Sequence, residues 1–363
     1  MTPAARGDRG TPTDDGRSDD GAASLDLRDG EVTQDENARK EGRTRPRAGS
    51  TFIIATRNRP AELLKTVTSI VAQTVLPGEL CIVDSSDITP VRDEIERLCR
   101  VPDLPLQYVH PAPRGLTIQR NLGLDMTSGD PVFLVDDDVY LAPDCHEQCL
   151  NEYARWGPEL GGVRATAITP ARPPRASIWW RKLFGIGGWW PEASGRLRSG
   201  FWIEGVSEAA GVRKVECFVG YFMSFRREVF DHFRFDEQLG GYAYKEDIDF
   251  TYRVSRRYSL VQIPKAKCEH FKTLTYRMPS YQLQRMNFGN QFYLHRKNLP
   301  QDAKHKAALW WGLIGLFFLN IGRAVRIRDP GLVTGWIVGA WEQARGKGLI
   351  DPWAERSNEV EAA

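Results

Sequence analysis

Apolar runs separated by polar breaks predict an alternation of strands and helices through the first part of the chain. A β-branched run at residues 50–56 predicts a strand, and residues 61–73 carry apolar side chains at the 3.6-residue spacing of a helix. Further runs predict a strand at 79–83, a helix at 90–99 and a strand at 106–109. Strand, helix and strand in succession form βαβ units, so we expect an α/β fold with a mostly parallel sheet flanked by helices.

Three consecutive carboxylates follow the next apolar run. Residues 131–135 read PVFLV and lead directly into Asp136, Asp137 and Asp138. A continuous apolar run is typical of a strand buried on both faces, and open α/β sheets bind ligands at the carboxyl ends of their strands. Because side chains alternate along a strand, Asp136 and Asp138 should share one face if the strand extends that far. Such a pair suits a divalent cation that serves a diphosphate, although three acids in a polar turn would have the same pattern.

Composition and charge narrow the classes of function. The 363 residues allow one large domain with appendages, and 49 Lys and Arg against 47 Asp and Glu leave a net charge of +2. Because basic residues are not in clear excess over acidic residues across the domain, we expect no nucleic-acid partner. The six cysteines show no zinc-binding pattern, which predicts buried, reduced thiols in a cytosolic protein. No glycine-rich dinucleotide or P-loop motif follows the first strand, which disfavours dehydrogenases and P-loop phosphotransferases.

The two ends of the chain differ in composition from its middle. Residues 1–49 are rich in Gly, Asp, Arg and Thr with almost no large apolar residue, so we expect a disordered tail without a signal peptide. Residues 50–275 should form the main domain, and residues 276–363 a helical region.

That helical region contains a strongly apolar stretch. The run at residues 307–322 is shorter than the roughly 20 residues that span a bilayer, and Arg323, Arg326 and Arg328 follow it. We therefore predict helices that lie in the cytoplasmic membrane interface, with arginines on anionic lipid. The alternative is a soluble helical hairpin that packs on the main domain or on a second subunit, as in a homo-oligomer.

Seven short motifs occur in a fixed order between residue 51 and about residue 270. They are ATRNR at 55–59, VDSS at 83–86, RNLG at 120–123, VDDD at 135–138, GYFMSFRREVF at 220–230, FDE at 235–237 and EDIDF at 246–250. In this order and spacing the chain resembles family 2 glycosyltransferases, which have the Rossmann-like GT-A fold. The resemblance implies an enzyme that moves a sugar from a nucleotide-diphosphate sugar to a hydroxyl acceptor.

The resemblance also implies roles for individual residues. The donor would be held by a set of residues that follow the first strands and open the next helix: Thr56, Arg57, Asn58, Arg59, Asp84, Arg114, Gly115, Arg120, Asn121, Asp136 and Asp137. Mn²⁺ or Mg²⁺ would bind Asp136, Asp138 and His270 as a DxD-type site. Asp247, with Glu246 beside it, would be the catalytic pair, and Asp247 the general base of an inverting single displacement.

Structural roles remain alternatives for several of these residues. Arg59 would also suit an ion pair with a neighbouring acid, Asp84 a turn cap, and His270 a partly buried strand end. Acids at 246–247 are favoured in the first turn of a helix on electrostatic grounds alone. The VDSS motif departs from the Asp-Asp-Gly-Ser that relatives often carry, which leaves the role of Ser85 open.

The acceptor is expected near residues 161–213, where the family varies. Tryptophans at 179–180 and 189–190 would stack on a sugar, lie at a membrane interface or pack against the domain. With a peripheral position on the inner face of the cell membrane, the acceptor would be a glycan or lipid-linked molecule of the cell envelope. The alternatives are a polyprenyl-phosphate glycosyltransferase and a non-catalytic, nucleotide-sugar-binding membrane module.

Overall fold

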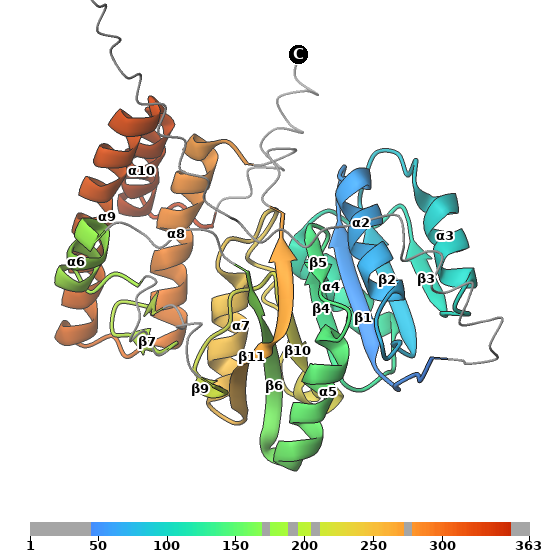
Figure 1. Ribbon diagram of the computed structural model, residues 1–363. Coiled ribbons are helices and arrows are strands. Elements are labelled where there is room, and N and C mark those ends of the chain that lie inside the picture. Colours follow the sequence, from blue (N-terminus) through green and yellow to red (C-terminus); the bar gives the residue numbers. More distant parts are fainter. Residues whose placement is uncertain (1–44, 169–174, 188–194, 205–210, 272–277, 350–363) are drawn as a thin grey trace, which may run out of the picture. The chain divides into compact units, whose positions relative to one another are not determined.

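The computed structural model describes residues 45–168, 175–187, 195–204, 211–271 and 278–349. Its helices and strands follow in the order shown in Figure 1. They are β1 Thr51–Thr56, α2 Pro60–Val71, β2 Glu79–Asp84, α3 Arg92–Arg100, β3 Leu106–Val109, α4 Leu116–Met126, β4 Val132–Asp136, β5 Val139–Leu141, α5 Cys145–Trp156, η1 Gly157–Glu159, β6 Leu160–Ala167, α6 Arg175–Leu183, β7 Leu197–Arg198, β8 Trp202–Ile203, β9 Arg213–Val215, β10 Phe222–Phe225, η2 Arg227–Asp231, α7 Glu246–Ser255, β11 Ser259–His270, α8 Ser280–Asn298, α9 Ala303–Ile327 and α10 Gly331–Ala344.

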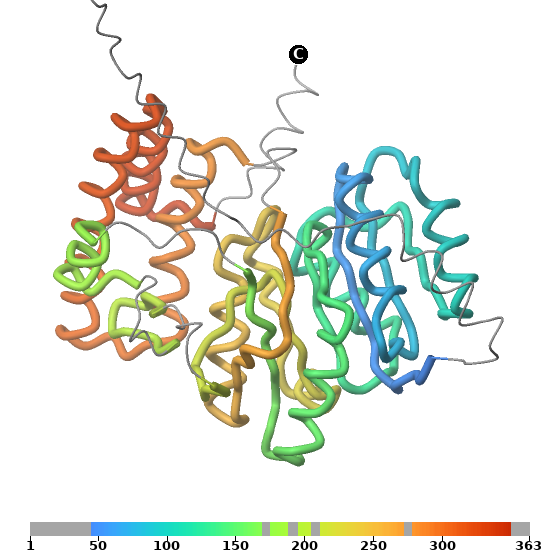
Figure 2. Tube along the Cα trace, in the orientation of Figure 1, coloured from blue at the N-terminus to red at the C-terminus, as the bar shows by residue number. Residues whose placement is uncertain are grey.

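The main sheet has the strand order β3-β2-β1-β4-β10-β6-β11-β5, and β9 pairs with β11. Strands β3, β2, β1 and β4 are parallel, and β10 is antiparallel to both β4 and β6. Strands β4 and β10 are distant in the sequence but lie side by side in the sheet (Figure 2). This sheet with flanking helices confirms the predicted α/β fold class.

Helices cover both faces of the sheet. Phe52 and Ile54 of β1 belong to the core beneath α2, α3 and α5, whereas Ile53 belongs to the core beneath α4 and α7. This alternation is what a strand buried on both faces requires. A Cβ at Gly123 of α4 would lie 2.5 Å from Cγ2 of Ile53, so this glycine lets α4 approach β1 closely. The close packing fixes the position of Arg120, one turn earlier in the helix.

Part of the segment predicted as an N-terminal tail packs on the main domain. Residues 1–44 are outside the described residues, as are Trp189 and Trp190. Within the expected tail, however, Arg47 already forms a bridge with Leu76, and the Ala48 backbone N–H donates to Leu76 O at 2.9 Å. The domain therefore includes at least residues 45–49. All six cysteines are free and buried, as predicted.

Helix α9 is longer than the apolar run within it. It comprises 25 residues, from the Asp302 cap, whose carboxylate accepts the His305 N–H, to Arg328 in a left-handed conformation with φ 56°. The predicted apolar run is therefore part of a longer helix whose ends are polar. By length and composition α9 meets the criterion for a membrane-crossing helix, which for a single helix is weak evidence. Polar contacts join the three C-terminal helices, including the Arg285–Glu342 ion pair at 2.6 Å.

Candidate active site

The three consecutive acids lie at the end of β4. The strand ends at Asp136, and Asp137 and Asp138 form a turn before β5, so strand alternation does not continue through them. The Asp137 carboxylate turns towards the loop after β1, where it accepts hydrogen bonds from Thr56 Oγ1 at 2.7 Å and from Arg59 at 2.5 Å. Asp137 thus holds this loop through hydrogen bonds, and its side chain is buried.

His270 reaches the same place from the end of β11. Strand β11 pairs antiparallel with β5, with His270 opposite Val139, and the Phe271 N–H donates to Asp138 O at 2.8 Å. As a result His270 Nε2 lies 3.0 Å from Asp138 Oδ1, and its ring stacks on Tyr221 with centroids 5.4 Å apart. The pairing of two short strand segments therefore brings together residues that are far apart in the sequence.

Asp136, Asp138 and His270 form a group with the chemistry of a metal site. One ligand atom from each lies within 4.8 Å of the others. Two carboxylate oxygens and an imidazole nitrogen are a donor set that Mn²⁺ accepts, and Mg²⁺ accepts the oxygens. Of the three side chains, Asp136 is the most open, with 32% of its side chain exposed. The residues predicted from the sequence as metal ligands are thus adjacent and fit a divalent cation.

Arg59 lies beside the group of Asp136, Asp138 and His270 and neutralises part of its negative charge. Its guanidinium contacts Asp138 Oδ2 at 2.7 Å as well as Asp137, so the ion-pair alternative for Arg59 is realised. Burial alone would raise the pKa of Asp138, but hydrogen bonds and charge from His270 and Arg59 lower it below its usual value. Asp138 is therefore ionised at neutral pH. In contrast, burial raises the pKa of Asp137 to about 7.

The loops after β1 and β2 meet at the same edge of the sheet. Asn58 donates from its backbone to Ser86 Oγ at 2.7 Å and from its side chain to Asp87 at 2.9 Å. Asp84 accepts from Ser86 N at 2.8 Å and from Tyr108 OH at 2.6 Å, as a turn cap would. These contacts bring residues predicted to bind the donor to one edge, where their predicted contacts with a nucleotide remain predictions.

The other residues of the predicted donor set lie around these loops. Arg57 and Arg114 both interact electrostatically with Asp87, and Arg114 lies 3.2 Å from it. Gly115 precedes α4 with φ 132°, a conformation that favours glycine.

Arg120 forms a buried ion cluster at the centre of the site. Its side chain is 3% exposed and contacts Glu246 at 2.5 Å and Asp136 at 2.9 Å. Burial raises the pKa of Glu246 even though Arg120 opposes the shift. Glu246 therefore serves to hold Arg120, and Arg120 links the metal-type group on β4 to the start of α7.

Asp247 follows Glu246 in the first turn of α7. Its carboxylate accepts the Gly220 N–H at 2.6 Å and the Ile248 N–H at 2.8 Å. A Cβ at Gly220 would lie 2.9 Å from Asp247 Cβ, so only glycine allows this approach. Burial raises the pKa of Asp247 against the lowering effect of these hydrogen bonds, and Asp136 and Asp247 interact electrostatically. Asp247 is thus near the acidic end of β4.

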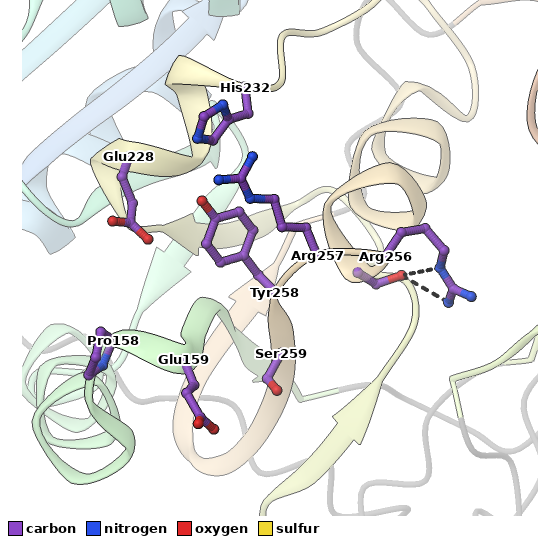
Figure 3. A pocket seen from close by; sticks show the side chains of 9 residues that line it. Pro158, Glu159, Glu228, His232, Arg256, Arg257, Tyr258 and Ser259 are labelled. Carbon is purple, nitrogen blue, oxygen red and sulfur yellow. Dashed lines mark hydrogen bonds between the residues drawn. The ribbon is translucent and has the colours of Figure 1, made fainter.

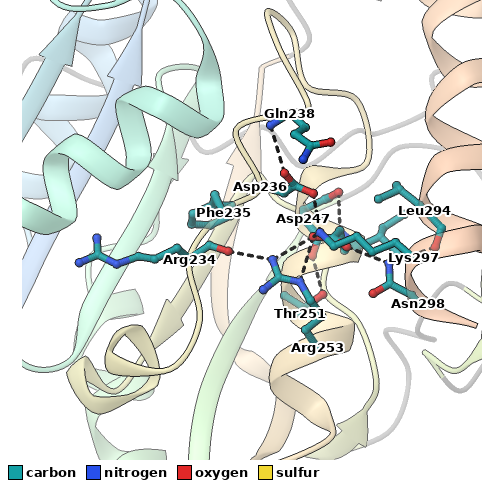
Figure 4. Close-up of polar contacts among 12 residues, drawn as sticks. Arg234, Phe235, Asp236, Gln238, Asp247, Thr251, Arg253, Leu294, Lys297 and Asn298 are labelled. Carbon is teal, nitrogen blue, oxygen red and sulfur yellow. Dashed lines mark hydrogen bonds and ion pairs between the residues drawn. The ribbon is translucent and has the colours of Figure 1, made fainter. Parts of the chain in front are cut away.

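A separate polar network anchors α7 to α8. Lys297 of α8 contacts both Asp249 at 2.9 Å and Asp236 at 2.6 Å, and Asn298 donates to Asp249 at 2.8 Å (Figure 4). Asp249 is fully buried and also pairs with Arg253. The network holds α7, and with it Asp247, against the C-terminal helices.

The side chain of Asn121 makes hydrogen bonds within the protein. Its side-chain amide donates to Phe235 O at 3.0 Å and to Glu237 at 2.8 Å, and its Oδ1 accepts the Phe235 N–H at 3.1 Å. Both ends of the amide are therefore used to hold the FDE loop. Asn121 thus positions a loop in this structure, and its predicted contact with the donor stays a prediction.

Sequence reasoning missed two residues that support the site, Gln119 and Arg164. Gln119 donates to Thr56 O at 3.0 Å and to Val83 O at 2.7 Å, which ties β1 to β2. Arg164 is fully buried in β6 and donates to Tyr221 OH at 2.5 Å, and Tyr221 carries the His270 ring. A lone arginine within an apolar strand was the available signal for Arg164, whereas nothing in the sequence marked Gln119.

A surface pocket elsewhere contains none of the predicted site residues. It is lined by Glu228, His232 and residues 158–159 and 255–259 (Figure 3). Its lining lies at the starts of β6 and β11, the amino ends of two parallel strands. Open α/β sheets bind ligands at the opposite ends of their strands, so this pocket is not our candidate site.

The chain is similar in sequence to two curated glycosyltransferases. The chain is 26% identical over 186 residues to the glucosyl-dolichyl phosphate glucuronosyltransferase of Haloferax volcanii, which covers 49% of this chain and 50% of that protein. It is 31% identical over 104 residues to the uncharacterized glycosyltransferase YwdF of Bacillus subtilis, covering 28% of this chain and 37% of that protein. The chain thus spans about half or less of the length of these curated relatives.

The chain also resembles a solved mannosyltransferase structure and matches a family-wide sequence model. The mannosyltransferase PcManGT from Pyrobaculum calidifontis, solved with GDP-Man and Mn²⁺, has a TM-score of 0.48 and 17% identity over 87% of this chain and 95% of that chain. The sequence model of Glycosyl transferase family 2 matches residues 51–234, which are 184 of the 363 residues. With more than half of the chain matched, this protein belongs to glycosyl transferase family 2.

Proposed function

We propose that this protein is an inverting, metal-dependent glycosyltransferase that moves a sugar from a nucleotide-diphosphate sugar to a hydroxyl of a lipid-linked acceptor. The observation that carries the proposal is the grouping of Asp136, Asp138 and His270 at the end of β4, joined through Arg120 to the acids that open α7. Family membership supports the reaction class, and the name of the Haloferax volcanii relative supports a lipid-linked acceptor.

The reaction develops negative charge on the departing nucleoside diphosphate and releases a proton from the acceptor hydroxyl. The proposal assigns these two tasks to different groups. A divalent cation held by Asp136, Asp138 and His270 would neutralise the charge of the departing nucleoside diphosphate. Asp247 would take the proton from the acceptor hydroxyl as its oxygen attacks the anomeric carbon, which inverts that centre. The raised pKa of Asp247 favours this role, because a more basic carboxylate accepts a proton more readily. Gly220 and Ile248 would hold the carboxylate in place.

Metal-dependent donor binding tests the proposal. We expect one nucleotide sugar in a panel, added with Mn²⁺, to raise the melting temperature, with stabilisation of about 2.7 kcal/mol at 100 times its Kd. Asp138→Asn should remove the Mn²⁺-dependent part of the shift, because it removes the ionised ligand of the group. Asp93→Asn, at an exposed acid of α3, is the matched control and should behave as the parent chain. An equal Mn²⁺-dependent shift in Asp138→Asn would refute the assigned metal site.

The membrane-facing part of the proposal rests on three exposed apolar stripes. Each of α6, α9 and α10 exposes large apolar side chains four residues apart, which places them on one helix face. The pairs are Trp179 and Leu183, Trp310 and Ile314 continuing to Phe318, and Ile337 and Trp341, all at least 45% exposed. We propose that these stripes contact the inner face of the cell membrane, with tryptophans at headgroup depth.

Charge substitutions on these stripes test the membrane contact. Trp310→Glu combined with Phe318→Glu should abolish sedimentation with phosphatidylglycerol vesicles while leaving the melting temperature nearly unchanged, since both side chains are about half exposed. Ile88→Glu, at an apolar side chain that is 73% exposed on a loop, is the matched control. If the double variant still binds vesicles but a parent dimer becomes monomeric, the stripes serve a second copy of the chain instead.

A further inference from the structure

We propose that Arg181, Tyr244, Lys245 and Arg323 form a binding site for the phosphate of a lipid-linked acceptor, next to Asp247. We call these four residues the cationic cluster. The inference rests on the proposed function and names the acceptor chemistry of that same site. None of the four residues was assigned a role in catalysis or donor binding above.

The cluster combines residues from three elements. Arg181 lies in the last turn of α6, Arg323 in α9, and Tyr244 and Lys245 directly before α7. The guanidinium groups of Arg181 and Arg323 interact electrostatically with each other and with Tyr244. Lys245 Nζ lies 5.7 Å from the centre of the Tyr244 ring, and both residues interact with Asp247. The cluster therefore continues directly into the proposed base.

Close packing fixes α6 on α9. The Trp180 indole N–H donates to Gly315 O at 2.8 Å, and the Trp311 indole N–H donates to Leu183 O at 3.0 Å. A Cβ at Gly315 would lie 2.2 Å from the Phe184 ring, so glycine is needed for this approach. Arg181 is thus held on an ordered helix between these contacts.

A second set of contacts fixes Lys245. Its ammonium group lies 4.9 Å from the centre of the Trp202 ring and donates to Gln291 of α8, which is fully buried. Gln291 in turn donates to Gly200 O at 2.6 Å. Lys245 itself adopts φ 75°, a conformation that costs energy for a residue with a side chain. The fold therefore holds this cation beside Asp247 although the backbone conformation of Lys245 is unfavourable.

The cluster carries more positive charge than the Asp247 carboxylate beside it can balance. Arg181 donates one hydrogen bond, to Gly187 O at 2.7 Å, and neither Arg181, Lys245 nor Arg323 forms an ion pair with a carboxylate in the described part of the chain. Burial and the charge of Arg323 lower the pKa of Arg181, and burial lowers the pKa of Lys245 to about 7. An anion that enters between Arg181 and Lys245 would stabilise the charged forms of both.

The surroundings indicate which anion. Arginine forks bind phosphate oxygens in pairs, which favours a phosphate ester over a single carboxylate. Arg181 and Arg323 lie on the same two helices, α6 and α9, that expose apolar stripes, but residues two apart such as Trp179 and Arg181 lie on different sides of a helix. A lipid with a phosphate head group would use both features of these helices, the apolar stripes for its chain and the cations for its phosphate. The donor diphosphate is assigned to the metal-type group on β4. A phosphate bound at the cationic cluster would therefore belong to the acceptor.

This position restricts the acceptor further. Tyr244 and Asp247 are three residues apart, so a phosphate at the cluster lies close to the base. The hydroxyl that Asp247 deprotonates would then belong to a sugar near the lipid phosphate. We therefore infer a short lipid-linked saccharide as the acceptor class, in preference to the distant end of a long polymer.

Binding of farnesyl phosphate to the full-length chain tests the inference. Titration calorimetry should show binding of farnesyl phosphate and none of farnesol at the same concentration. Arg181→Gln and Arg323→Gln should each weaken binding by about tenfold or more, as expected for loss of a hydrogen bond to a charged group. Arg326→Gln, one turn further along α9 and exposed, is the matched control and should bind as the parent does.

Two further measurements separate the sources of phosphate and the two proposals. Binding to phosphatidylglycerol vesicles should fall equally in Arg323→Gln and Arg326→Gln. If the two variants also bind farnesyl phosphate equally well, Arg323 serves lipid headgroups and the inference is wrong. Binding of the donor with Mn²⁺ should be the same in the parent and in Arg181→Gln. Absence of donor binding in the parent chain would refute the proposed function but not the phosphate site.

Discussion

Asp247→Asn is expected to lower kcat for sugar transfer by roughly 10²- to 10⁴-fold, the usual contribution of a positioned general base. The donor Kd should change little, because Asp247 is assigned to the acceptor hydroxyl. Measurement of kcat together with donor binding distinguishes loss of a step from loss of binding. The amide also loses one acceptor for the Gly220 or Ile248 N–H, so a modest drop in melting temperature is expected.

The neighbouring acid of the same helix provides the control. Asp249→Asn makes the same chemical change two residues further on, where the carboxylate pairs with Lys297 and Arg253. That variant should be less stable than the parent but should keep kcat within a few-fold at a temperature where it is folded. A wild-type rate in Asp247→Asn, or an equal loss in both variants, would contradict the assignment of Asp247 as the base.

The rate should also depend on pH through Asp247. A base must be ionised to accept a proton, and the pKa of Asp247 is raised by burial. Activity of the parent should therefore fall as the pH decreases, beginning at a higher pH than an exposed aspartate would give. The residual activity of Asp247→Asn should lack this acidic limb. A profile with the same limb in both proteins would mean that another group is responsible.

Arg120→Met is expected to lower the free energy of unfolding by about 3–5 kcal/mol, which would be the largest stability effect in the site. The substitution leaves Glu246 and Asp136 without their shared cation, and unpaired buried charges are costly. Urea unfolding measures this difference. Arg92→Met, which removes an exposed pair with Glu96, should cost less than about 1 kcal/mol and serves as the control.

The pH dependence of the Arg120→Met defect checks its cause. Without Arg120, Glu246 in the folded state has a pKa still further above its unfolded value, so the native state binds more protons than the unfolded state. Stability should therefore rise as the pH falls towards that unfolded value, and the defect should be smaller at pH 5 than at pH 8. Glu246→Gln in the same background should recover part of the loss. A defect independent of pH would indicate lost packing of the arginine side chain instead.

Local patterns predicted the strands and helices of the first part of the chain correctly. The βαβ order, the strand at Leu106–Val109 and the position of the acids at the end of β4 follow from apolar runs and their periodicity, which are properties of neighbouring residues. The sequence analysis placed Asp136 and Asp138 on one face of a strand if that strand extended to Asp138. This condition is not met, because β4 ends at Asp136. The two acids still belong to one group because the following turn directs Asp138 towards β11.

Contacts between distant segments had to come from the tertiary structure. His270 reaches Asp138 only because β11 pairs with β5, and Arg120 joins Asp136 to Glu246 only because α4 packs closely on β1 through Gly123. Asn121, next to Arg120, instead holds the FDE loop, and no local pattern separates the two roles.

The sequence alone determined the family, the order of the first strands and helices and the residue types available for metal and proton chemistry, since these depend on short-range patterns and on motifs. The tertiary structure decided which of those residues meet, which are used to hold loops, and that α6 and α9 bring Arg181 and Arg323 to the residues before Asp247. The physical reason is that burial and charge pairing arise between segments far apart in the chain, and only folding determines which segments become neighbours.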